Sequence, residues 1–92
     1  MTNQQRIDLM RQRLEAHLQP THLHFTDDSH LHAGHAGARG GAGHFSVDIV
    51  AEGFVGKSRV QRHQMVYAAV GDLIPSEVHA LAIRAKTPAE QA

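Results

Sequence analysis

The chain has 92 residues, and nine Lys and Arg balance nine Asp and Glu, so its formal net charge is zero. This length supports one modest hydrophobic core, and zero net charge excludes a whole-molecule attraction to nucleic acid or an anionic membrane. No cysteine is present, which excludes a disulfide framework and any thiolate ligand or nucleophile from this chain.

The N-terminal segment is amphipathic and lacks the apolar centre of a signal peptide. No stretch approaches the ~20 apolar residues that a membrane span needs. We therefore expect one cytoplasmic domain over residues 1–92, with no membrane association.

The first half of the chain contains a helix, a strand and a loop in turn. Apolar residues at helical spacing predict a helix that begins at Thr2 or Asn3 and ends before Pro20. Residues 22–27 alternate between apolar and polar side chains, which predicts a short edge strand. Residues 28–43 hold five of the eight glycines and no apolar periodicity, so we expect a mobile loop there.

The second half contains a strand, a helix and a strand. Residues 44–52 alternate cleanly, and after a turn at 53–57 Ser58 caps a helix whose apolar stripe runs from Val60 to Leu73 and Ile74 before Pro75. Residues 77–85 form the most apolar strand, which we expect to be covered on both faces, at least in part. Residues 86–92 are expected to form a polar tail. The order predicts an α+β fold, a three-stranded sheet with helices packed on one face.

Nine histidines are the most informative feature of the composition, and four of them (His30, His32, His35 and His44) fall between residues 28 and 45. Imidazole is a common ligand for zinc, copper and iron, and its pKa lies close to physiological pH. The cluster predicts metal binding or proton-linked chemistry. The alternative is that a short polar loop tolerates histidine as readily as asparagine or serine.

A small basic cluster marks the start of the second helix. It consists of Lys57, Ser58, Arg59 and Arg62, and it follows the turn GFVG. KH domains clamp a nucleic-acid backbone with a G-x-x-G turn, but Phe54 and Val55 are too apolar for the usual phosphate-binding turn. The cluster predicts a surface for an acidic partner or, as an alternative, for nucleic acid.

His63 either packs beside Tyr67 or joins this basic surface, and His44 is expected to pack at the base of the loop. Nothing in the sequence supplies the nucleophile, base and oxyanion stabiliser of a catalytic site, so an enzyme is not expected.

Three segments together resemble the BolA family: DDSHLHAGH, FVGKSRVQRHQMVY and EVHALAIRAKTPAE. The similarity runs from about residue 6 to about residue 90. It implies a small domain similar to the type II KH fold, α-β-β-α-β, with a short helical turn near residues 53–55 before the second long helix. Family members partner with monothiol glutaredoxins in 2Fe–2S cluster trafficking and iron homeostasis, and some bacterial members are described as regulators of transcription or morphology.

The resemblance also implies which residues bind the cluster. The histidine of the HAL motif corresponds to His79, and the loop ligand corresponds to His32, with His35 as its nearest competitor and His30 as a weaker one. With no cysteine here, the other ligands would be thiolates of the glutaredoxin and its glutathione. No cofactor is expected in the isolated chain, which would be a monomer or a weak homodimer. The alternative is a DNA-binding regulator that uses the KH-like surface with Lys57, Arg59 and Arg62.

Overall fold

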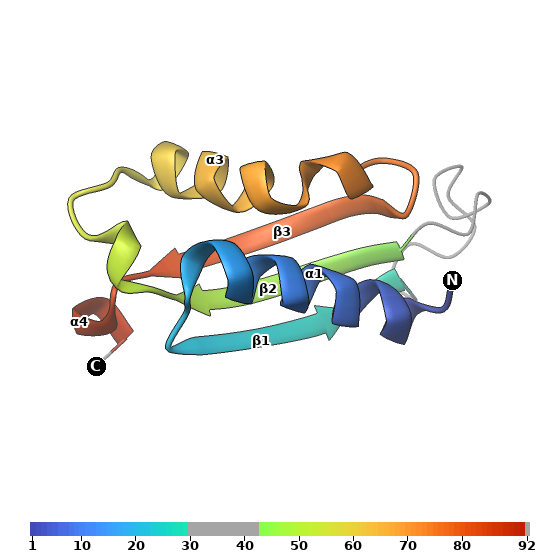
Figure 1. Cartoon of the computed structure of the whole chain (residues 1–92), viewed down its shortest axis with the longest axis horizontal. Helices are drawn as coiled ribbons and strands as arrows, with labels where there is room; N and C mark the ends of the chain where they lie inside the picture. The colour runs from blue at the N-terminus through green and yellow to red at the C-terminus, as the bar shows by residue number, and fades with distance from the viewer. Residues whose placement is uncertain (30–42, 92) are drawn as a thin grey trace.

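The computed structural model describes residues 1–29 and 43–91. Figure 1 shows two long helices lying together over one face of a three-stranded sheet. The strand order is β1-β2-β3, with β1 antiparallel and β3 parallel to β2. This mixed α+β sheet is the predicted class. The elements are α1 (Asn3–Leu18), β1 (His22–Asp27), β2 (Gly43–Val50), η2 (Glu52–Phe54), α3 (Arg59–Val70), η3 (Gly71–Leu73), β3 (Val78–Lys86) and α4 (Pro88–Gln91).

One hydrophobic core joins the helices to the sheet. Capping boxes at Thr2 and Ser58 begin the two long helices, as the sequence predicts for the second and allows for the first. The 3-10 turn η2 falls where the family resemblance places a short helical turn. No helix within the described ranges is long and apolar enough to cross a membrane. The largest fully buried side chains are Phe45, Phe54, Met10, Leu14, Ile49, Val47, Val66, Val70 and Val78.

The prediction that the last strand is covered on both faces, at least in part, is wrong, because the face of β3 opposite the core is exposed; β3 is also an edge strand beside the central β2. Leu81 packs into the core, whereas Ala80 and Ala82 are exposed on the opposite face. These alanines raise the apolar content of the segment, but their small side chains do not need to be buried. The connection through α3 returns the chain parallel to β2, on the side that β1 leaves open.

The second long helix differs from its prediction at both ends. Val60 is 65% exposed and does not join the core. The α-helix ends at Val70, and the Ile74 N–H then donates to the Gly71 carbonyl at 3.1 Å in a 3-10 turn. Pro75 has no N–H to continue the α-helical pattern and disfavours helical backbone at the residue before it.

The segment predicted as a polar tail is ordered by a second local motif. Thr87 is buried and forms a reciprocal pair with Glu90: the Thr87 N–H donates to Glu90 Oε1 at 2.8 Å, and the Glu90 N–H donates to Thr87 Oγ1 at 3.2 Å. With Pro88 at the first helical position, TPAE is a capping box. It starts the short helix α4 directly after β3.

Arg62 fixes this C-terminal turn to the rest of the domain. Its Nη1 and Nη2 donate to the two Glu90 carboxylate oxygens at 2.6 and 3.3 Å, and Nη1 also donates to the Ala85 carbonyl at 3.1 Å. Its Nε donates to the Lys57 carbonyl at 3.0 Å. The Arg62 hydrogen bonds, followed by the Thr87 backbone N–H, lower the pKa of Glu90 from 4.5 to about 2.

A bulge interrupts the parallel pairing of β2 with β3 at its start. Gly43 pairs with Val78, but His44 pairs with Ala80, so His79 is the extra residue. The ring of Phe45 folds over Gly43, and a Cβ placed on Gly43 would lie 2.2 Å from two of its ring carbons. Only glycine fits this position beside the bulge.

We expect Gly43→Ala to destabilise the domain by about 1–3 kcal/mol, because the new methyl group displaces the packed ring of Phe45. Urea unfolding followed by circular dichroism measures the change. Gly71→Ala is the matched control, since a Cβ at Gly71 meets nothing within 4 Å, and its stability should change by less than about 0.5 kcal/mol. Equal stability of the two variants would contradict this account of Gly43.

The Arg62–Glu90 pair predicts a pH dependence of stability. The folded-state pKa of Glu90 is lowered, so its ionised form favours folding above pH 4.5, and this contribution disappears as the pH falls from 4.5 to about 2. We expect Glu90→Gln to be less stable than the natural chain at pH 7 and equally stable at pH 2. Urea unfolding across this range measures the difference.

The same glutamine substitution in an Arg62→Gln background is the control for this pH effect. Because the guanidinium is the largest cause of the pKa shift, most of the pH-dependent difference should vanish there. A difference that persists undiminished at pH 2 would show that charge on Glu90 is not its source.

Candidate functional site

His79 lies at the beginning of β3 with its side chain exposed. Uninterrupted alternation would place it on the same strand face as Leu81 and Ile83. The bulge corrects that expectation: Val78 occupies the core position with no exposed surface, and His79 turns outward. An exposed imidazole on a strand is available to a ligand or a partner, which a core histidine is not.

The ring of His44 lies against that of His79. The two ring centroids are 4.9 Å apart, and the ring planes are tilted by 47°. His44 is only 7% exposed. It lies beside the segment that enters the 30–42 region, as predicted, but its contact with His79 is not predicted by the sequence analysis. One signal could have predicted this contact: parallel strands begin at the same edge of a sheet, so the first residues of β2 and β3 lie close together.

Hydrogen bonds fix the backbone around His44. Its N–H donates to Ser29 Oγ at 3.1 Å, and its carbonyl accepts from the Asp28 N–H at 2.8 Å. Asn3, at the start of α1, donates to Asp27 Oδ2 at 3.0 Å and to Ser29 Oγ at 3.3 Å. The first turn of α1 therefore holds the end of β1 beside the start of β2.

The loop histidines His30, His32 and His35 lie outside the described residues. Within 1–29 and 43–91, no group of three or more His, Cys, Asp or Glu residues is arranged to hold a metal ion. This part of the chain thus brings two imidazoles together and leaves further ligands to be supplied from elsewhere. Three other histidines, His17, His22 and His24, are exposed.

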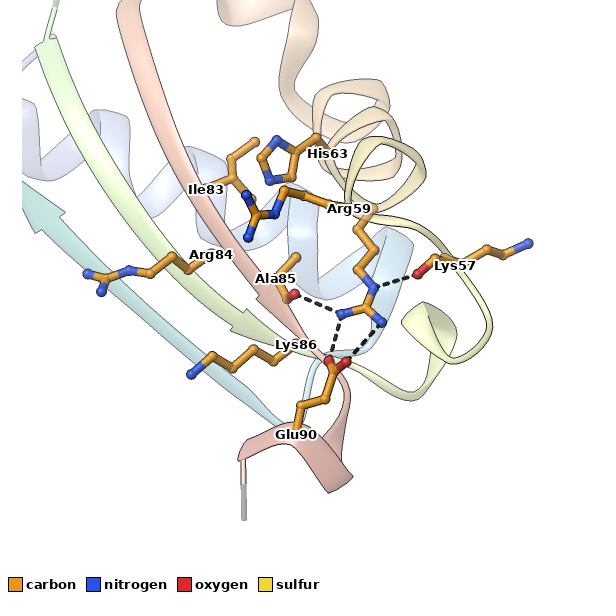
Figure 2. Close-up of a pocket in the computed structure, with 9 residues that line it drawn as sticks. Lys57, Arg59, His63, Ile83, Arg84, Ala85, Lys86 and Glu90 are labelled. Carbon is orange, nitrogen blue, oxygen red and sulfur yellow. Dashed lines mark hydrogen bonds and ion pairs between the residues drawn. The ribbon is translucent and has the colours of Figure 1, made fainter.

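A basic groove of about 600 Å³ lies at the opposite end of β3 from His79, and Figure 2 shows residues that line it. It includes four of the five residues predicted for a partner or nucleic-acid surface and adds residues from β3. The side chain of the fifth, Ser58, accepts the Gln61 N–H at 3.1 Å as the cap of α3. The lining residues are Lys57, Arg59, Arg62, His63, Ile83, Arg84, Ala85, Lys86 and Glu90.

The cations of this basic groove have different roles. Arg62 is held by Glu90 and by backbone carbonyls, and Arg84 Nε lies 3.0 Å from Asp48 Oδ1. Lys57, Arg59 and Lys86 are exposed and give the groove its positive charge. His63 lies beside Ile83 on its wall (Figure 2).

The preceding turn, GFVG, is anchored by Phe54, whose side chain is fully buried. Val55, in contrast, is 59% exposed. The turn therefore has a packing role, as its apolar composition indicates.

Comparison with known proteins identifies the family. The family model described as BolA-like protein matches residues 14–90. SufE-like protein 1, chloroplastic/mitochondrial, of Arabidopsis thaliana is 48% identical over 86 residues, which cover 88% of this chain and 23% of that protein. The DNA-binding transcriptional regulator BolA of Haemophilus influenzae is 34% identical over 82 residues, covering 89% of this chain and 77% of the relative.

The fold agrees with solved structures of the same family. The structure of BolA1 from Arabidopsis thaliana matches with a TM-score of 0.78 and 38% identity, covering 92% of this chain and 94% of that chain.

The chain spans between 23% and 58% of the length of several curated relatives. These relatives include chloroplastic and mitochondrial proteins, so the cytoplasmic location stays a prediction. Their names describe BolA-like proteins and a transcriptional regulator, and none indicates an enzymatic family. The chain belongs to the BolA family.

Proposed function

We propose that this chain is a non-enzymatic adaptor that pairs with a monothiol glutaredoxin and donates histidine ligands to a 2Fe–2S cluster carried between the two proteins. The observation that carries the proposal is the exposed His79, turned out of the core by a bulge. The bulge turns the His79 imidazole outward, and bulges often redirect side chains next to functional sites. This favours a ligand role for His79 over a packing role.

The donor chemistry fits a shared cluster. This chain contains no cysteine, so it contributes imidazole nitrogen, while the glutaredoxin and its glutathione contribute thiolate sulfur. Mixed histidine and cysteine ligation of a 2Fe–2S cluster is chemically established and raises the reduction potential relative to cysteine alone. The second imidazole in this proposal is His32 or His35.

In this function the cluster is cargo that passes between the two proteins, not a resident cofactor of this chain. A chain that offers only imidazoles leaves the remaining ligands with its partner, which keeps the cluster exchangeable between the two proteins. Imidazole must be deprotonated to bind iron, so ligation weakens as the pH falls. Acidification would therefore favour return of the cluster to thiolate ligands.

Mixing this protein with a cluster-loaded monothiol glutaredoxin and glutathione tests the proposal. We expect a heterodimer by size-exclusion chromatography and a changed visible circular dichroism spectrum, because nitrogen replaces sulfur on iron. His79→Ala should reduce the spectral change severalfold while the thermal unfolding midpoint stays within a few degrees, since this side chain is exposed. An unchanged spectrum without a heterodimer would refute the adaptor function.

His24→Ala is the matched control for that experiment. His24 is exposed on β1 and pairs in the sheet with Asp48, several residues from the bulge. The control should preserve both the heterodimer and its spectrum. Equal loss in both variants would indicate nonspecific binding of iron by surface histidines.

A second candidate function is DNA binding through the basic groove, on a surface that we propose to be KH-like. The groove supports it because Lys86 and Arg84 of β3 join Lys57 and Arg59 in one concave surface. A relative is a DNA-binding transcriptional regulator by name. Three or four cations neutralise only a few phosphates, so binding would be modest at physiological salt.

The second candidate predicts DNA binding that weakens steeply with salt. Lys57→Ala and Arg59→Ala should each weaken binding to duplex DNA and lower the slope of log affinity against log salt by about one. Fluorescence anisotropy over a salt series measures both quantities. Arg13→Ala, on α1 outside the groove, is the control and should leave the slope unchanged; equal effects of all three substitutions would dismiss the groove.

A further inference from the structure

We infer that His44 and His79 form a two-imidazole site for a divalent transition-metal ion, available in this chain without a partner. The inference goes beyond the adaptor function, because it requires neither a glutaredoxin nor an iron–sulfur cluster. It rests on the contact between two side chains that the fold brings together from neighbouring strands.

The separation of the rings suits shared coordination. With Zn–N bonds of about 2.0–2.1 Å and a near-tetrahedral angle, the centroids of two imidazoles on one zinc ion lie roughly 5 Å apart. The observed centroid separation is 4.9 Å. The 47° tilt also differs from the parallel planes of a stacked pair. Coordination requires one nitrogen of each ring to face the same ion, and the exposed His79 ring is the one with room to rotate.

Both imidazoles are attached to β-strands rather than to loops, which limits the cost of organising the site. His44 is in the central strand, its backbone is fixed by Ser29 and Asp28, and its ring is nearly buried. His79 is the extra residue of the bulge, which follows the pair Gly43 and Val78. Ligands on strands lose less conformational freedom on binding than ligands on loops.

The donor atoms determine the class of metal. Imidazole nitrogen suits zinc, copper, nickel and cobalt, whereas magnesium and calcium prefer oxygen. Two protein ligands leave the other positions to water, so the affinity is expected to be modest beside that of a three- or four-ligand site. The exposed face of His79 provides the entry path. A bound ion would occupy the same imidazole that the adaptor function assigns to the cluster.

The test uses the full chain with His30, His32 and His35 replaced by glutamine, so that these residues cannot supply ligands. Titration with zinc chloride at pH 7.5, followed by calorimetry, gives the affinity, and NMR correlation of the imidazole nitrogens identifies the rings that bind. We expect one zinc ion and shifts at both His44 and His79. Unmoved nitrogens of His44 at saturating zinc would overturn the inference without any further substitution.

Two substitutions separate ligation from packing. His44→Phe keeps a ring against His79 but removes the nitrogen donor, so it should weaken zinc binding at least tenfold, as should His79→Ala. His22→Gln and His24→Gln are controls and should have no effect. Unaltered affinity in His44→Phe would assign His44 a packing role only.

Because no glutaredoxin is present in this titration, its outcome is independent of the adaptor function. A failed zinc titration leaves the cluster experiment unaffected. Likewise, a failed cluster experiment leaves the two-histidine site intact.

Discussion

The parallel pairing of β2 with β3 determines where the chemistry of this domain lies. Parallel strands begin at the same edge of a sheet, so His44 and His79 meet although they are 35 positions apart in the sequence. Regular alternation would bury His79, and the one-residue bulge sends it outward while Val78 fills the core. Gly43 lies directly before the register shift, and the Phe45 ring occupies the space of any larger side chain there. Core packing and the exposed histidine therefore meet at the same short stretch of β2 and β3.

The two ends of β3 carry different chemistry. Its beginning holds His79 beside His44, and its end contributes Arg84 and Lys86 to the basic groove, at the far end of the molecule (Figure 1). Zero net charge therefore conceals a local excess of positive charge, because acidic residues elsewhere balance it. A partner that engages both ends must extend along the whole strand, whereas two small ligands could occupy them independently.

The sequence predicts most of the framework because local signals specify it. In the strand Gly43–Val50, the buried residues Phe45, Val47 and Ile49 alternate with Ser46 and Asp48, and the long helices begin at capping boxes. The failures have nonlocal or overlooked causes. The alanines of the last strand favour coverage of both faces, although they do not require it. No periodicity reveals a bulge, because it arises from the pairing of two distant segments. The short helix α4 could have been predicted from the sequence, because TPAE is a capping box. Its polar composition instead favoured the interpretation as a tail.

Sharing of His79 links the two proposals that concern the histidine end. One imidazole cannot ligate an iron of a cluster and a separate divalent ion at the same time, so occupation of the two-histidine site removes a ligand from the cluster. The reciprocal effect follows by linkage, because any free energy by which zinc opposes cluster binding must equally oppose zinc binding when the cluster is present. His44 distinguishes the two states. A nearly buried ring in the central strand is well placed to bind a small ion between itself and His79, whereas a cluster held on a partner protein is reached most directly through the exposed imidazole. The chain's own geometry would then favour the small ion whenever no partner presents a cluster.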